Sequence, residues 1–181
     1  MSQRFEFTEL RLAGLHIIDP KPIEDSRGNL TRFFCANEFE QLGFKRPIAQ
    51  MNTTLTKQKG VVRGMHFQCA PHQEQKIVSC VSGAICDVVV DMREASPTYL
   101  QWHSEILSQD NKRSILIPEG FAHGFQTITK NCSLLYLHSE FYAPEAERGL
   151  RYNDPQLAIE WPEKVTFVSD RDKSHPFIEK K

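Results

Sequence analysis

The sequence predicts an all-β protein, built as a sandwich or closed barrel with only a few short helices. From Gln50 onward, short runs rich in β-branched and aromatic residues recur at regular spacing, separated by Gly and Pro, which is typical of such folds. Helix start and stop signals are clear in one short segment only. A chain of 181 residues can bury a core without disulfides or a metal, so we expect one domain spanning residues 1–181.

The composition argues against several classes of partner. The chain has 22 Lys and Arg against 23 Asp and Glu, so its bulk charge does not favour nucleic acid or an anionic membrane. The five cysteines form no Cys-x-x-Cys pair, and the first residues lack an apolar signal core. No window approaches the roughly 18 consecutive apolar residues of a membrane-spanning helix. We therefore expect a soluble, cytoplasmic protein with reduced cysteines and without nucleic-acid or membrane partners.

The first fifty residues predict two strands and one short helix. The strands span residues 10–18 and 30–34, which are apolar or aromatic and border turn clusters rich in Pro, Gly and Asp. The helix spans residues 37–43, with Asn37 as its N-cap and Gly43 as its stop. At about two turns, it is a minor element beside the strands.

The later strands follow in quick succession. Residues 76–81 and 84–90 flank a Ser-Gly pair, which is a two-residue hairpin signal. Residues 114–117 form a further apolar run, and residues 134–138 are the last strand that the pattern predicts. Residues 143–181 carry several prolines and scattered charges, so we expect this segment to wrap the barrel irregularly.

One predicted strand, residues 61–68, carries two side chains suited to chemistry. His66 can act as a base, and Arg63, three residues earlier, is permanently positively charged. Simple alternation along this strand would place Arg63 and His66 on opposite faces. Gly64 lies between them, and a β-bulge at this glycine would re-aim the side chains that follow. Arg63 and His66 could then share one cavity.

Two motifs set the superfamily that the chain resembles. Gly64-x-His66 and, some fifty residues later, Pro118-x-Gly120-x-x-His123 resemble the two-motif layout of the cupins, which implies a jelly-roll barrel. Cupin metal sites usually take His-x-His and a nearby Glu, but Gln68 stands where the second His is expected. His72 and Glu74 are possible substitutes, although a catalytic metal needs three protein ligands at set geometry. We expect no metal and keep a metal-dependent cupin oxygenase or isomerase as an alternative.

A longer series of motifs occurs in order along the chain. It comprises Asp25-Ser26-Arg27-Gly28, Gln50-x-Asn52, Arg63-Gly64-Met65-His66-Phe67-Gln68, Lys76, Asp87-Val88-Val89-Val90-Asp91-Met92-Arg93, Pro118-x-Gly120-Phe121-Ala122-His123-Gly124-Phe125 and Asp154-Pro155. Together these motifs resemble the dTDP-4-dehydrorhamnose 3,5-epimerase family, over about residues 7–172. The resemblance implies a cupin-type jelly-roll homodimer without metal or other cofactor. Its substrate would be a nucleoside-diphosphate 4-keto-6-deoxyhexose, inverted at C3, C5 or both.

The implied chemistry is removal of a proton from a carbon beside a ketone, followed by return of a proton to the opposite face. His66 is the candidate base, because an imidazole titrates near the working pH. Tyr136, on a strand far along the chain, is the candidate acid facing His66 across the barrel lumen. Lys76 is the candidate cation for the enolate oxygen.

The carboxylate that partners His66 cannot be chosen from the sequence itself. Glu74, Asp87 and Asp91 lie closer to His66 along the chain. Only the resemblance assigns this role to Asp172, whose carboxylate would fix the tautomer of the ring.

The other predicted residues would bind the nucleotide sugar. Guanidinium groups suit the diphosphate, aromatic rings suit the base, and polar side chains suit the cavity wall. The candidates are Arg27 and Arg63 for the diphosphate, Phe33 and Tyr142 for the base, and Gln50, Asn52, His123 and Arg171 for further substrate contacts.

Each of these roles has an alternative. Either candidate histidine, or Tyr136, could be a core side chain with its polar atom satisfied, and Asp172 could be a solvated charge. Leu30 and Arg32 depart from the family, which commonly shows an aromatic residue and a Glu there. A CDP- or GDP-linked substrate, or inversion of a single carbon, is therefore an alternative. A non-catalytic nucleotide-sugar binding module is another.

Overall fold

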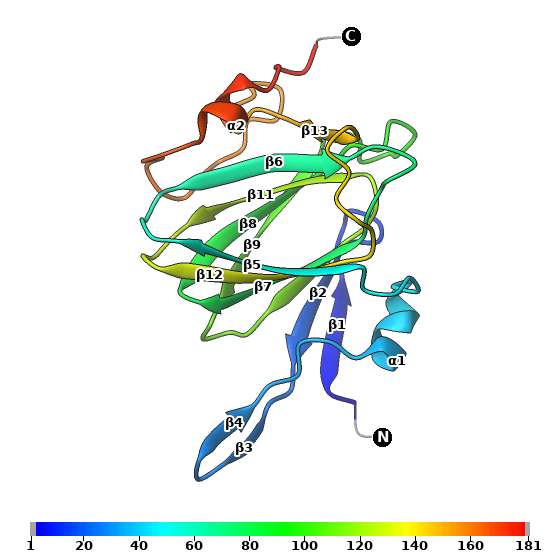
Figure 1. Cartoon of the computed structure of the whole chain (residues 1–181), viewed down its shortest axis with the longest axis vertical. Coiled ribbons are helices and arrows are strands. Elements are labelled where there is room, and N and C mark those ends of the chain that lie inside the picture. Colours follow the sequence, from blue (N-terminus) through cyan, green and yellow to red (C-terminus); the bar gives the residue numbers. More distant parts are fainter. Residues whose placement is uncertain (1–2, 180–181) are drawn as a thin grey trace.

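A computed structural model describes residues 3–179 as two β-sheets packed face to face (Figure 1). The six-stranded sheet has the order β1-β2-β10-β7-β12-β5, the five-stranded sheet has the order β13-β6-β11-β8-β9, and β3 and β4 form a separate two-stranded arm. The strands are β1 (Phe5–Glu9), β2 (His16–Pro20), β3 (Ile23–Asp25), β4 (Gly28–Leu30), β5 (Gln50–Thr56), β6 (Val62–Gln68), β7 (Lys76–Ser82), β8 (Ala84–Asp91), β9 (Trp102–Ser108), β10 (Ser114–Ile117), β11 (Phe121–Thr127), β12 (Cys132–His138) and β13 (Glu147–Gly149). The helices are α1 (Ala36–Phe39), the 3-10 turn η1 (Glu40–Leu42) and α2 (Asp170–Ser174).

The chain passes repeatedly from one sheet to the other, as in a jelly roll. From β5 to β8, each strand lies in the opposite sheet from the strand before it. The all-β class and the jelly-roll barrel are therefore confirmed. The predicted hairpin between β7 and β8 is wrong, because these strands belong to different sheets. Gly83, with a φ of 74°, turns the chain at this corner, where a Cβ would lie 2.6 Å from the Thr129 hydroxyl.

The N-terminal elements differ from the pattern in their boundaries. The apolar run at 10–18 is not one strand, because a tight turn separates β1 from β2 and the Leu10 amide donates to the Leu15 carbonyl. The run at 30–34 contributes only Leu30 to β4, because Phe34 packs edge-on against Phe39 instead of pairing in a sheet. Aromatic packing thus replaces strand pairing here.

The predicted helix is present in a shortened form. Helix α1 begins at Ala36, so Cys35 is the N-cap and the assignment of Asn37 is wrong. After Phe39 the chain continues as the 3-10 turn η1. Gly43 ends this turn with a φ of 79°, as the sequence predicts for a helix stop.

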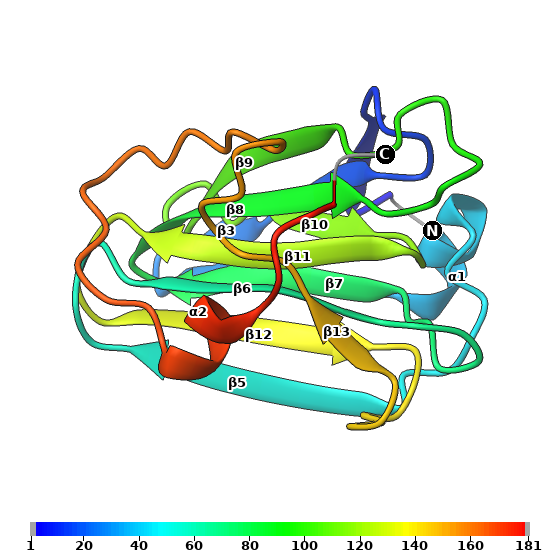
Figure 2. The same ribbon diagram turned by 90° about the horizontal axis from the view of Figure 1, so that it is seen from above.

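Strand β8 shows how the layers are built. Ile85 and Val89 face the apolar core between the two sheets, whereas Cys86, Val88 and Val90 face the other way. The long C-terminal segment crosses that outer face (Figure 2), as expected. Its residues Leu150 and Leu157 complete a second apolar cluster. This wrapping brings α2 back onto β6 (Figure 1).

The space between the sheets is filled unevenly. Apolar side chains of β2, β8, β9 and β10 fill one part, and polar side chains of β5, β6, β11 and β12 surround a cavity in another. Within residues 3–179, no helix has the length and apolar content required to cross a bilayer.

Candidate active site

The cavity has a volume of about 300 Å³ and lies between the two sheets. Strands of both sheets supply its walls, so residues far apart in the sequence meet there. Most of the predicted site residues line it: Gln50, Asn52, Arg63, His66, Lys76, His123, Tyr136 and Tyr142. An opening this size, with several convergent polar groups, is typical of a small-molecule site.

A bulge in β6 brings Arg63 and His66 to the same cavity. His66 lies opposite His123 on β11, whereas Arg63 lies opposite Phe125, so three steps along β6 match two along β11. Gly64 sits at this irregularity with a φ of 116°, a conformation that side-chain-bearing residues rarely adopt. The bulge at Gly64 that would bring the two side chains together is present.

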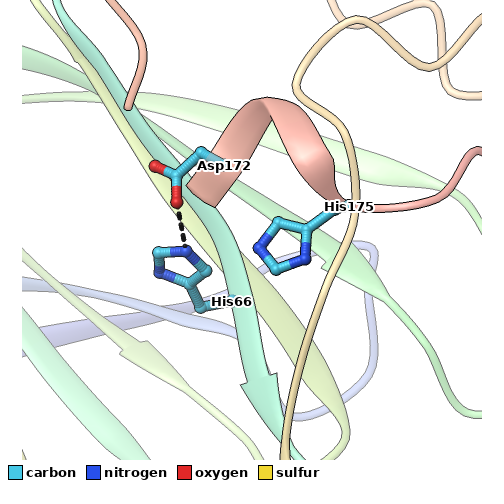
Figure 3. A group of neighbouring side chains, drawn as sticks. All are labelled: His66, Asp172 and His175. Carbon is cyan, nitrogen blue, oxygen red and sulfur yellow. Dashed lines mark hydrogen bonds and ion pairs between the residues drawn. The ribbon is translucent and has the colours of Figure 1, made fainter. Parts of the chain in front are cut away.

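His66 and Asp172 form a hydrogen-bonded pair, shown in Figure 3. The Asp172 Oδ1 atom lies 2.8 Å from the His66 Nε2 atom, and the Gly64 amide donates to Oδ2 at 3.1 Å. Because an ionised carboxylate only accepts hydrogen bonds, His66 Nε2 carries the proton and Nδ1 carries the lone pair. Burial would raise the pKa of Asp172, but the bonds from His66 and Gly64 outweigh it and lower that pKa.

Helix α2 fixes the position of this carboxylate. Ser169 caps the helix by accepting a hydrogen bond from the Asp172 amide at 3.0 Å. Asp172 is buried, and Asp170 in the same helix is fully exposed. The assignment of Asp172 as the partner of His66 therefore agrees with the geometry.

Tyr136 stands on β12, in the sheet opposite to His66. Its ring stacks on His138 with centroids 5.8 Å apart and meets the His123 ring edge-on at 6.1 Å. Burial raises the pKa of Tyr136 well above its usual value, and the negative charge of Asp87 acts in the same direction. The phenol thus keeps its proton at neutral pH, as a general acid requires.

His123 belongs to a second histidine–aspartate pair. Its Nε2 atom lies 2.7 Å from Asp87 Oδ2, and both side chains are buried. Asp87 was one of the carboxylates that the sequence left open as a partner for His66, and the structure gives it to His123 instead.

Lys76 is held at the cavity wall by Glu74. The Lys76 ammonium donates to Glu74 Oε1 at 2.7 Å, and His138 Nδ1 donates to Oε2 at 2.7 Å. Burial would raise the pKa of Glu74, but Lys76 and His138 lower it to about 2. Glu74 therefore orients Lys76 and His138 through one contact with each.

A fourth carboxylate, that of Glu147, lines the cavity. The Tyr142 hydroxyl donates to its Oε2 atom at 2.7 Å, and Arg171 contacts the same atom. The Tyr142 amide donates to Gln50 Oε1 at 2.6 Å. These contacts tie Arg171 and Tyr142 into one group beside the cavity.

Arg27 and Phe33 lie away from the cavity of their own chain. Arg27 occupies the turn of the β3–β4 arm, which projects from the body of the molecule (Figure 1), and its side chain is 87% exposed. It bonds to Asp25 within the same turn at 2.6 Å. The expectation that these two residues bind substrate is therefore not met within a single chain.

The cupin-type metal site does not form at the positions that the motif suggested. Gln68 is buried and accepts from the Ala143 amide at 2.7 Å while donating to the His72 carbonyl at 2.8 Å, so it ties two loops together. His72 itself is partly exposed. The chemistry of these donors gives no support to a metal-dependent oxygenase.

The match to known proteins decides the family. The model of the family described as dTDP-4-dehydrorhamnose 3,5-epimerase matches residues 9–180. The chain belongs to this family. The 3,5-epimerase of Sinorhizobium fredii is 39% identical over 173 residues, covering 95% of this chain and 89% of that protein.

Solved structures of the family share the fold closely. The dTDP-4-dehydrorhamnose 3,5-epimerase of Bacillus anthracis, with TDP and PPi bound, gives a TM-score of 0.93 at 36% identity and covers 96% of this chain and 99% of that one. The Legionella pneumophila 3,5-epimerase in complex with dTDP-4-keto-L-rhamnose gives 0.90 at 39% identity, with coverage of 96% and 92%. The predicted sugar epimerase of this family is thereby confirmed.

Several site residues of this epimerase were not predicted. Glu147 and His138 line the cavity, Glu74 orients Lys76, and Asp87 binds His123. Asp87 and Glu74 were considered, but for other roles. His138 gave no motif signal, and its i+2 spacing from Tyr136 on one strand was the only indication that both face the same side.

We expect Asp172→Asn to reduce epimerase turnover by about 100-fold to 10,000-fold, the range typical of losing a group that supports a general base. The neutral amide cannot stabilise the imidazolium, and one of its two polar atoms donates where both carboxylate oxygens now accept. The measurement is kcat of the purified variant. Asp170→Asn, on the same helix but fully exposed, is the matched control, and equal turnover in the two variants would contradict the role of Asp172.

Glu74→Gln should make the free energy of unfolding less dependent on acid pH. The folded-state pKa of about 2 lies below the usual 4.5, so the ionised carboxylate stabilises the fold above pH 4.5 and this contribution fades as pH falls toward 2. Denaturant unfolding at a series of pH values will show a shallower decline in the variant. At neutral pH, leaving buried Lys76 without its partner should cost about 3–5 kcal/mol. Glu145→Gln, an exposed change, should reproduce the parent curve.

Proposed function

We propose that the protein inverts C3 and C5 of a dTDP-linked 4-keto-6-deoxyhexose, as in the conversion of dTDP-4-dehydro-6-deoxyglucose to dTDP-4-dehydrorhamnose. The observation that carries the proposal is the placement of the His66–Asp172 pair and Tyr136 on opposite sheets around one cavity. Support for the substrate comes from the Legionella relative in complex with dTDP-4-keto-L-rhamnose.

The first step is proton removal by His66. Its Nδ1 lone pair takes the proton from the carbon beside the C4 ketone, and the bonding electrons move onto the ketone oxygen as an enolate. Asp172 stabilises the imidazolium that forms, because its carboxylate stays ionised and hydrogen-bonded to Nε2. General-base assistance of this kind typically contributes about 100-fold to 10,000-fold.

The second step is reprotonation from the other face. The Lys76 ammonium, held by Glu74 at the cavity wall, stabilises the enolate oxygen, and a preorganised partner of this kind is typically worth about 3 kcal/mol. Tyr136 then delivers its phenolic proton to the carbon on the face opposite to His66. A proton leaves one face and another arrives on the other, so the configuration inverts without any change in oxidation state.

The nucleotide end would lie toward the open side of the cavity. Arg63 is exposed there, and a second hollow of about 620 Å³ shares Arg63 and His66 and is also lined by Arg171. Two guanidinium groups suit a diphosphate. Tyr142, exposed beside Glu147, offers a ring for stacking on the base.

A 3-epimerase is the second candidate. The dTDP-4-dehydrorhamnose 3-epimerase of Streptomyces niveus is 39% identical over 165 residues, covering 91% of this chain and 79% of that protein. Leu30 and Arg32 lie on and beside the arm, where the family pattern has an aromatic residue and a Glu, so a change in specificity, including a CDP- or GDP-linked substrate, would arise there.

Solvent exchange separates these possibilities. In heavy water, the parent should place deuterium at C3 and C5 of the 4-keto sugar, whereas a 3-epimerase labels C3 only and a binding module labels neither carbon.

His66→Ala should abolish exchange at both carbons. Tyr136→Phe should spare proton removal more than inversion, as measured by NMR. Equal loss of exchange and inversion in that variant would contradict Tyr136 as the acid.

We further propose that the protein acts as a homodimer in the cytoplasm. The β3–β4 arm exposes Ile23 and Leu30, which are 47% and 69% accessible, and the edge strand β5 exposes Met51 and Leu55, which are 67% and 54% accessible. Apolar side chains gathered at a sheet edge and a projecting arm favour association between copies. The five unpaired cysteines suit a reducing compartment. In such a dimer, Arg27 of the arm would serve the cavity of the other copy.

Mixing two inactive variants tests this arrangement. Arg27→Ala and His66→Ala should each lose most activity alone, and light scattering should give the mass of a dimer for both. When they are unfolded and refolded together, the mixed dimers should regain activity, because one cavity then combines an intact His66 with the intact arm of the other copy. A mixture that stays inactive would place Arg27 on its own cavity or outside the site.

A further inference from the structure

We propose that His66, Asp172 and His175 form a site for a divalent cation of the Zn²⁺ type, and that its occupation inhibits the enzyme. One ligand atom from each of these residues lies within 4.8 Å of the other two. Within residues 3–179, this is the only such group of three His, Cys, Asp or Glu side chains. Figure 3 shows the three side chains turned toward a common space between β6 and α2.

His175 contributes a ring nitrogen that has no other task. Its Nε2 atom is buried and has no hydrogen-bond partner among the described residues, although a buried polar atom left unpaired typically costs about 1–3 kcal/mol. A bound cation would satisfy this atom.

The position of His175 is held by packing. Its ring lies against Gly149, where any Cβ would collide with it, and it meets the ring of His66 edge-on at 5.7 Å. Gly149 is itself paired with His66 across β13 and β6. The absence of a side chain at position 149 therefore leaves room for an imidazole directly beside the His66–Asp172 pair.

The donor set suits zinc. Two imidazole nitrogens and one carboxylate oxygen are ordinary Zn²⁺ ligands, and three protein ligands leave a fourth position for water. With Zn–N bonds of about 2.0–2.1 Å, ligand atoms of a tetrahedral site lie roughly 3.3 Å apart. His66 Nε2 and Asp172 Oδ1 lie 2.8 Å apart, so these two atoms would move slightly apart around a cation, and the His175 ligand atom lies within 4.8 Å of both.

We expect inhibition because a bound cation changes which ring nitrogen of His66 carries the proton. This step rests on the proposed function. In the metal-free pair, Nε2 carries the proton and Nδ1 carries the lone pair that removes the substrate proton. A cation bound at Nε2 needs the lone pair on that nitrogen, so the ring proton moves to Nδ1 with no net proton released. The nitrogen left for the substrate is then protonated and cannot act as a base.

Cobalt and zinc titrations of the intact protein test the site. After treatment with a chelator, CoCl2 added to the parent should give the visible absorption of a tetrahedral cobalt site at one equivalent, and ZnCl2 should abolish both that absorption and epimerase activity. EDTA should restore the activity. Absence of cobalt absorption in the parent would overturn the proposal. The absorption does not depend on turnover, so a protein that binds cobalt but never epimerises the sugar refutes the proposed function and not the site.

The deciding variant is His175→Ala, compared with His72→Ala, which removes a partly exposed histidine elsewhere in the molecule. Both variants should keep the thermal stability and the metal-free turnover of the parent. His175→Ala should weaken cobalt binding and zinc inhibition by at least tenfold, whereas His72→Ala should match the parent. Undiminished zinc inhibition in His175→Ala, or an equal loss in both variants, would overturn the assignment.

Discussion

The close approach of β6 and β11 is the constraint on which the site depends. Gly64 and Gly124 face each other there, and a Cβ on Gly64 would lie 2.6 Å from the Cα of Gly124. Because neither residue has a side chain, the two strands can touch while β6 carries its extra residue. That extra residue turns Arg63 and His66 into the same cavity and aims the Gly64 amide at Asp172. This close backbone contact thus brings Arg63, His66 and Asp172 together.

A common electrostatic pattern runs around the cavity. Asp172 stands behind His66, Asp87 behind His123, and Glu74 behind Lys76. A nitrogen that lines the cavity engages each carboxylate, and Asp172 and Asp87 are buried. A ligand in the cavity therefore meets nitrogen donors and acceptors whose orientation these carboxylates fix. Such preorganised groups need little rearrangement as charge develops on a reacting oxygen.

The sequence was most informative where local chemistry decides the outcome. The glycine between Arg63 and His66 indicated the bulge, and the short punctuated runs indicated a sandwich or barrel. It failed where long-range packing decides. Nothing local shows that β7 and β8 pass to different sheets, because a tight glycine turn serves a hairpin and a sheet corner equally well. The pairing of His66 with Asp172, 106 residues away, likewise needed either the family resemblance or coordinates. The run at 30–34 looked like a strand because aromatic residues favour both sheets and clusters.

The C-terminal wrap has a consequence for how the molecule matures. The last strand of the two main sheets ends at Gly149. Asp172, which orients the His66 imidazole, lies in α2, some twenty residues later in the chain. During synthesis, the sandwich can assemble before this helix has left the ribosome. The catalytic centre would then be finished after the body that surrounds it, as a separate docking event on an already folded surface.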